Sequence, residues 1–194
     1  LPSLSTMTSG GALTMNMGPG SVMVGWDSPG SLALSALTTS SMPTNVTIVD
    51  NGTVSNPYKK FFVNRANLTI DQDVTLLGSG SQYDRSEFVQ SSVTLNAGKT
   101  ITGTDVNQIG IAQRSYDTAG LNTIALTNNG TISLSGNSST GIVGDYATIN
   151  NTASGIINIS GNNSTGIFSA NGSAVTNSGV ININATGTGN SAVG

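Results

Sequence analysis

Apolar residues in the last third of the chain come in short bursts, separated by stretches of Gly, Ser, Thr and Asn. In GIINISGNNSTGIF, residues 155–168, the first burst alternates apolar and polar positions and a second burst closes the segment. Alternation with a period of two is typical of β-strands, because successive side chains point to opposite faces. No window of the chain shows the spacing of an amphipathic helix. The pattern therefore predicts short strands joined by Gly- and Asn-rich corners.

This pattern repeats along the chain, with Gly130, Gly155 and Gly179 at spacings of 25 and 24 residues. The repeated segments are NGTISLSGNSSTGIV (129–143), SGIINISGNNSTGIF (154–168) and SGVININATGTGNSAV (178–193). Periods of about 20 to 50 residues are typical of solenoids and related repeat architectures. The apolar positions that match between segments are Ile132, Ile157 and Ile181; Leu134, Ile159 and Ile183; Ile142, Ile167 and Val193; and, before the later segments, Ile149 and Val175.

The repeat predicts an all-β fold, a right-handed parallel β-helix with rungs of about 24–26 residues. Each strand would lie about 4.8 Å from its equivalent in the next rung. Ile would then stack on Ile in the core, and Asn on Asn at the corners would form amide ladders. The alternative is a sheet of hairpins, because Asn-Gly at 51–52, 129–130 and 171–172 favours hairpin turns. Hairpins would not require the same sequence in every unit, so we prefer the β-helix.

The repeat divides the chain into three parts. Residues 124–194 are expected to form regular repeats that continue beyond this segment. Residues 45–123 keep strand alternation with irregular spacing, and they are expected to form irregular rungs with loop insertions at 55–67 and 81–90. Residues 1–44 are rich in Gly, Ser, Met and Pro, so we expect an irregular N-terminal cap or a leader, since terminal rungs need a cap.

The composition of the chain narrows the classes of function that it can have. The chain is 36% hydrophobic but only 8% charged, with a net charge of −3. Nucleic-acid binding depends on clustered Lys and Arg, so we expect no nucleic-acid partner. There is no His and no Cys, which excludes His-dependent catalytic triads, His metal ligands and disulfides. The sequence has no signal peptide and no apolar run of about 20 residues, and we expect it to be a mature segment of a longer chain.

The units NNGTISLSGNSSTGIV and ASGIINISGNNSTGIF resemble passenger domains of very large type V autotransporter adhesins, such as fusobacterial outer-membrane adhesins. The resemblance covers residues 124–194, is weak over 45–123 and is absent over 1–44. It implies a β-helical stalk at the surface of a Gram-negative bacterium, tethered by a C-terminal outer-membrane barrel outside this chain. It also implies adhesion to a host-cell receptor, a glycan or partner bacteria.

Carboxylates that could support catalysis or bind a metal are few. Asp71 and Asp73 are two residues apart, so in a strand they would share one face and could contribute to a cation site. No loop of calcium-ligand spacing surrounds them. Asp84, Arg85 and Glu87 cluster in a predicted insertion, and a solvated loop explains them. We therefore expect no catalytic residues, no metal site and no cofactor.

The most distinctive predicted insertion concentrates aromatic and cationic residues in a chain that is poor in both. Such side chains favour binding hot spots and contacts with sugars or anions. The alternative is that the two Phe residues pack in the core and the two Lys residues are solvated. The candidate ligand-binding residues are Tyr58, Lys59, Lys60, Phe61, Phe62 and Arg65, and a second candidate is Tyr83-Asp84-Arg85.

The sequence thus predicts a surface-exposed β-helical adhesin segment that mediates or scaffolds attachment and is not an enzyme. One alternative is a β-helical carbohydrate-active enzyme, such as a polysaccharide lyase or a tailspike. Another is an inert stalk or spacer, with the binding site elsewhere in the parent protein.

Overall fold

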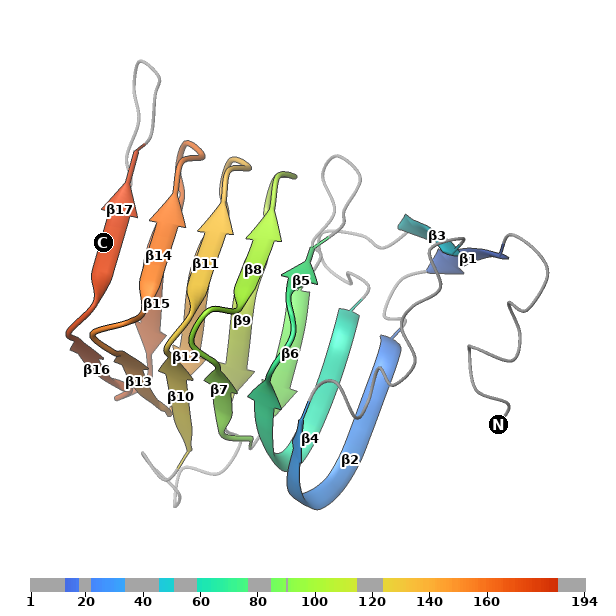
Figure 1. Ribbon diagram of the computed structural model, residues 1–194, viewed down its shortest axis with the longest axis horizontal. Helices are drawn as coiled ribbons and strands as arrows, with labels where there is room; N and C mark the ends of the chain where they lie inside the picture. The colour runs from blue at the N-terminus through green and yellow to red at the C-terminus, as the bar shows by residue number, and fades with distance from the viewer. Residues whose placement is uncertain are drawn as a thin grey trace.

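The computed structural model describes residues 13–17, 22–33, 46–50, 59–76, 85–89, 91–114 and 124–184. All the regular elements in these ranges are β-strands, and every strand pairing is parallel. Equivalent strands lie side by side in successive turns of the chain, as Figure 1 shows. This arrangement is a parallel β-helix, and it confirms the predicted fold class. Parallel pairing also excludes the hairpin alternative at Asn129-Gly130, because the flanking strands, Ala125–Asn128 and Thr131–Leu134, belong to different sheets.

Three walls enclose the core. Wall A consists of β7 (Val93–Leu95), β10 (Ala125–Asn128), β13 (Thr148–Asn151) and β16 (Ala174–Asn177). Wall B consists of β5 (Val74–Thr75), β8 (Thr100–Gly103), β11 (Thr131–Leu134), β14 (Ile156–Ile159) and β17 (Val180–Ile183). Wall C consists of β6 (Arg85–Val89), β9 (Ile109–Arg114), β12 (Thr140–Asp145) and β15 (Thr165–Ala170). The chain visits walls A, B and C in turn, which makes one rung.

A long strand, β4 (Lys59–Ile70), joins walls A and C into one ten-stranded sheet. Its first part pairs with β6 and its last part with β7. On its other side it pairs with β2 (Val22–Ala33). A separate two-stranded sheet pairs β1 (Leu13–Met17) with β3 (Val46–Asp50). Residues 22–33, assigned from the sequence to a cap or leader, thus form the terminal strand of the large sheet.

The register confirms the predicted stacking of equivalent apolar residues. In wall B, Ile132 lies opposite Ile157, and Ile157 lies opposite Ile181. In wall C, Ile142 lies opposite Ile167; Val193, predicted to continue this column, lies outside the described residues. The predicted period holds over these rungs, but the rung before them is longer, because Ile132 lies opposite Ile101. Register shifts occur in β2, β4 and β6, upstream of the regular repeats.

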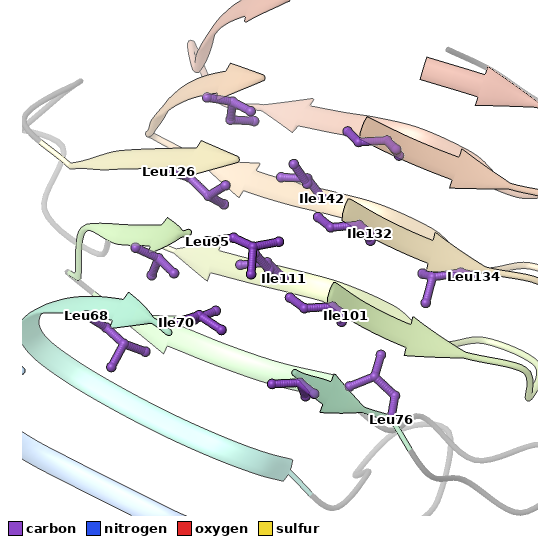
Figure 2. Packing of buried hydrophobic residues seen from close by; sticks show 14 of the residues in the cluster. Leu68, Ile70, Leu76, Leu95, Ile101, Ile111, Leu126, Ile132, Leu134 and Ile142 are labelled. Carbon is purple, nitrogen blue, oxygen red and sulfur yellow. The ribbon is translucent and has the colours of Figure 1, made fainter. Parts of the chain in front are cut away.

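Apolar side chains fill the interior between the walls. Figure 2 shows them pointing inward from successive rungs. In wall B the strands alternate half-buried and buried positions, so every second side chain enters the core. Burying one such Leu or Ile contributes roughly 1.5–3 kcal/mol, so stacked aliphatic columns are the main source of stability. The largest fully buried side chains are Leu68, Ile70, Leu76, Leu95, Ile101, Ile111, Leu126, Ile132 and Leu134.

A repeated left-handed residue turns the chain from wall B to wall C. Asn107, Ser138 and Asn163 have φ values of 61°, 58° and 55° in successive rungs. The Asn107 N–H donates to the carbonyl of Asn137, and the Ser138 N–H donates to that of Asn162. Asn tolerates this conformation better than most residues, because its short side chain can hydrogen-bond locally. The corner is thus itself stacked from rung to rung.

Candidate binding surface

The outer face of wall B carries short neutral side chains in two columns. One column runs through Thr100, Thr131, Ile156 and Val180, and the other through Thr75, Thr102, Ser133, Asn158 and Asn182. These residues are half-buried or exposed, because the buried positions between them point into the core. Asn182 Nδ2 donates to Asn158 Oδ1 at 2.8 Å, so the amides also stack outside the core. The face offers hydroxyl and amide groups at the repeat distance of the rungs, about 4.8 Å.

Asp73 lies at one edge of this face, between β4 and β5. Its Oδ1 accepts from the backbone N–H of Thr100 at 2.9 Å and from the Thr100 hydroxyl at 3.1 Å. These hydrogen bonds hold the pKa of Asp73 below its usual value, the backbone bond contributing most. The carboxylate therefore joins two successive rungs. Asp71 and Asp73 lie outside the strands and not on one strand face, so the strand geometry assumed for a cation site is wrong.

A buried amide ladder replaces an aliphatic column at the edge of wall A. Ile70 and Leu95 occupy this column in the first rungs, and Asn128, Asn151 and Asn177 follow them. Asn128 Nδ2 donates to Asn151 Oδ1, and Asn151 Nδ2 donates to Asn177 Oδ1, both at 2.8 Å. The Gly130 N–H donates to Asn128 Oδ1, which fixes the amide orientation. The predicted Asn ladder is confirmed, and it is structural, because Asn128 and Asn151 are almost fully buried.

The predicted aromatic and cationic site falls on a strand, not on a loop insertion. Lys59, Lys60, Phe61, Phe62 and Arg65 all belong to β4, whereas Tyr58 lies outside the described residues. The assignment of residues 59–67 to an insertion is therefore wrong. The physical reason is that aromatic residues favour the pleated surface of a strand. Their role in binding stays a prediction.

The backbone register shows which residues adjoin this segment. Phe61 lies opposite Val24 and Ser86, and Lys59 lies opposite Val22 and Arg85. Two cationic residues of the first and second candidate sites thus occupy neighbouring positions in adjacent strands. In the second candidate, Arg85 begins β6, whereas Tyr83 and Asp84 lie outside the described residues. Arg65 falls where the register of β4 with β2 shifts.

Two carboxylates of the described residues, Asp73 and Asp145, are held by hydrogen bonds on different walls. Asp145 Oδ1 accepts from Asn171 Nδ2 at 2.6 Å at the end of wall C, remote in the fold from Asp73 on the edge of wall B. Within the described ranges, no group of three His, Cys, Asp or Glu side chains is placed to hold a metal ion.

Sequence reasoning overlooked the outer face of wall B. Its signal is present in the polar positions between the inward apolar residues, as in Thr100-Ile101-Thr102 and Thr131-Ile132-Ser133. In the sequence alone, these positions indicate only a strand. Rung stacking turns them into columns, and that step requires the register between distant segments. The missed feature is therefore a product of topology, not of a local motif.

Comparison with known proteins gave no match to a family model, to a curated protein or to a solved structure. In the part of the chain that the structure describes, no helix is long and apolar enough to cross a membrane. The fold and its surfaces are thus the basis for any functional conclusion.

Proposed function

We propose that this chain is a noncatalytic segment of a surface-exposed adhesin, attached to the outer membrane of a Gram-negative bacterium through a barrel in another part of the parent protein. The observation that carries the proposal is the parallel register of wall B over successive rungs, from β5 to β17. Such stacking gives an extended scaffold whose outer columns repeat at a fixed distance. The segment would mediate or scaffold attachment to a host-cell receptor, a glycan or partner bacteria.

Glycans are the ligands that best suit the outer face of wall B. Sugar hydroxyls both donate and accept hydrogen bonds, as do the Thr and Ser hydroxyls and Asn amides of the face. Repetition of equivalent groups along the β-helix would let a linear polymer contact several rungs at once. Weak single contacts would then add through multivalency. The aromatic and cationic residues of β4 are a second candidate for binding the same ligand class.

The arrangement of carboxylates supports a binding role over catalysis. Glycoside hydrolysis uses a pair of carboxyl groups about 5–9.5 Å apart across the scissile bond. Among the described residues, Asp73 is engaged with Thr100 on wall B and Asp145 with Asn171 on wall C. Both carboxylates thus join successive rungs, which supports a structural role for them.

The proposal is tested with the purified chain on a panel of glycans and host cells, with retention and release of sugar fragments recorded in the same wells. One variant replaces Thr102 and Ser133 on wall B by Ala. Its matched control replaces Thr94 and Thr127, which hold equivalent outward positions on wall A. A third variant replaces Tyr58, Phe61 and Phe62 together by Ala.

We expect retention without cleavage. A loss of about tenfold or more in the wall B variant, but not in the wall A control, assigns binding to wall B, and a loss in the aromatic variant assigns it to β4. Release of sugar fragments would overturn the proposal in favour of a carbohydrate-active enzyme. If the chain shows no retention and releases no sugar fragments, the segment acts as a spacer, and this outcome would contradict a binding role.

A further inference from the structure

Two Asn-Gly dipeptides of the described structure lie in opposite environments. When glycine follows asparagine, the glycine nitrogen can attack the side-chain amide of the asparagine, because glycine has no side chain to hinder the approach. The chain contains Asn-Gly at 51–52, 129–130 and 171–172, and the first of these lies outside the described residues. The other two differ in how firmly the fold holds the reacting atoms.

Asn129-Gly130 is held by hydrogen bonds within and between rungs. The Gly130 N–H donates to Asn128 Oδ1 at 3.1 Å, and Asn129 Oδ1 accepts from the Thr152 hydroxyl at 2.9 Å. The Asn129 N–H donates to the Leu95 carbonyl in the preceding rung. Gly130 is buried, and a Cβ there would overlap backbone atoms of that rung. The Gly130 nitrogen can therefore reach the Asn129 amide only when the rungs open locally.

Asn171-Gly172 lies in the turn between β15 and β16, and the reacting nitrogen is not held there. Both residues are exposed, with φ values of 47° and 77°, and within the described ranges the Gly172 N–H has no hydrogen-bond partner. Residues 171–173 connect the strands that residues 146–147 connect in the preceding rung, so this turn is one residue longer. A Cβ at Gly172 would meet no atom within 4 Å. The turn thus has room to change conformation while β15 and β16 stay paired.

The side-chain amide of Asn171 joins this turn to the preceding rung. Its Nδ2 donates to Asp145 Oδ1 at 2.6 Å. A carboxylate acceptor makes such a bond stronger than one between neutral groups. The bond engages the nitrogen that leaves when an amide is lost, and not the carbon that is attacked. Loss of the Asn171 amide would therefore remove a contact between rungs.

We infer that Asn171 is a site of spontaneous deamidation and that the fold protects Asn129 from the same reaction. The Gly172 nitrogen attacks Asn171 Cγ and loses its proton, the Cγ–Nδ2 bond breaks, and Nδ2 leaves with that proton as ammonia. Water then opens the succinimide ring at either carbonyl, which gives aspartate or isoaspartate. Water is the only co-reactant, and nothing is oxidised or reduced. The inference is independent of the proposed adhesive function.

Deamidation of Asn171 would weaken the turn that carries it. The product places a carboxylate beside the Asp145 carboxylate, so repulsion between like charges replaces a hydrogen bond. Isoaspartate also adds a carbon atom to the main chain between β15 and β16. The contact between this turn and the preceding rung would thus be lost gradually as the protein ages.

The test incubates the whole chain in mildly alkaline buffer and follows Asn129 and Asn171 in the same sample by peptide mass spectrometry. The fragmentation method distinguishes aspartate from isoaspartate. A parallel sample in urea exposes both dipeptides as unfolded chain. The matched variant is Asn171→Gln, which keeps a side-chain amide but requires a larger ring for the attack.

In the folded chain, Asn171 should deamidate about tenfold faster than Asn129 or more, because Asn129 reacts only through local opening. In urea the two rates should become similar, and Asn171→Gln should show no modification at residue 171 over the same period. No reaction at Asn171, equal rates in the folded chain, or the same difference in urea would overturn the inference. Hydrogen exchange of Asn171→Asp tests the effect on the turn: faster exchange in residues 165–177 supports it, and unchanged exchange would contradict it.

Discussion

Asn151 occupies the middle of the buried ladder, where it accepts from Asn128 and donates to Asn177. Asn151→Leu removes both bonds and leaves the buried Asn128 Nδ2 with only a 3.4 Å contact to the Ile156 carbonyl. We expect the free energy of unfolding to fall by about 1–3 kcal/mol in urea titrations. Asn182→Leu, on the exposed outer face, is the control and should change it by less than about 0.5 kcal/mol. Equal losses would show that the buried ladder has no special role.

Gln113 presents the opposite case, a buried amide without partners. Neither Gln113 Oε1 nor Gln113 Nε2 has a hydrogen-bond partner in the described structure, and the residue is fully buried. Gln113→Met keeps the length of the side chain and removes the desolvated amide, so stability should rise by about 1 kcal/mol. Gln108→Met is the control, because only Gln108 Nε2 lacks a partner, whereas Gln108 Oε1 accepts from the Asp105 N–H, so stability should rise less or fall. Thermal unfolding measures both; a destabilised Gln113→Met would show that the amide is satisfied.

The lowered pKa of Asp73 predicts how the free energy of unfolding depends on pH. Its pKa is lowered in the folded state by hydrogen bonds from Thr100, so folding favours the carboxylate. The stabilisation is fully present above the unfolded pKa, about 4, and is lost as the pH falls through the folded pKa. Unfolding measured from pH 7 to pH 2 should show a decline below about pH 4 that is smaller in Asp73→Ala. An unchanged profile in the variant would show that the contact is not linked to folding.

At the scale of elements, substitutions at two glycines distinguish the effect of close contact between rungs from the effect of turn geometry. A Cβ at Gly161 would overlap the backbone of Gly136 in the preceding rung, whereas a Cβ at Gly172 would meet nothing within 4 Å. Gly161→Ala should therefore cost at least about 2 kcal/mol, because the rungs must separate. Gly172→Ala, at a φ of 77°, should cost only about 1 kcal/mol of left-handed strain. Urea titrations compare the two, and similar costs would contradict close rung contact at Gly161.

Strands were predictable where the repeat is regular, and less so upstream. The alternation in Ile132-Ser133-Leu134 and its later copies encodes both the strand and its register, since equivalent residues must stack. The segment 59–67 carries no such copy, and its aromatic and cationic composition suggested a loop. The structure makes it part of β4, because a long strand can serve two walls at once. Local composition does not contain that information.

At the scale of the whole molecule, stability should vary along the β-helix. Each rung contacts only its neighbours, so the terminal rung has half the contacts of an internal one. Ile132 and Leu134 are almost fully buried, whereas their equivalents in β17, Ile181 and Ile183, are only partly buried. Backbone amides of β11 should therefore exchange with solvent about a hundredfold more slowly than those of β17. Uniform protection would indicate that the end of the β-helix is covered in solution.

The candidate site was less predictable than the fold, for a topological reason. Thr102, Ser133 and Asn158 are distant in sequence, and each alone is an ordinary polar residue of a strand. They form a surface only because three rungs share one register. The composition of Tyr58 and its neighbours suggests a binding site, but composition gives the residue types and not their positions in the fold.

The near-identity of successive interfaces has a consequence for how such a chain changes over time. Ile157 pairs with Ile132 in the same way that Ile181 pairs with Ile157. Duplication or loss of a whole unit therefore produces contacts between rungs of the same kind as those already present. Insertions of a few residues within a strand would shift the register, but a recombination event that copies one full unit would not. The number of rungs, and with it the length of the β-helix, can therefore change during evolution while the packing within each rung stays the same.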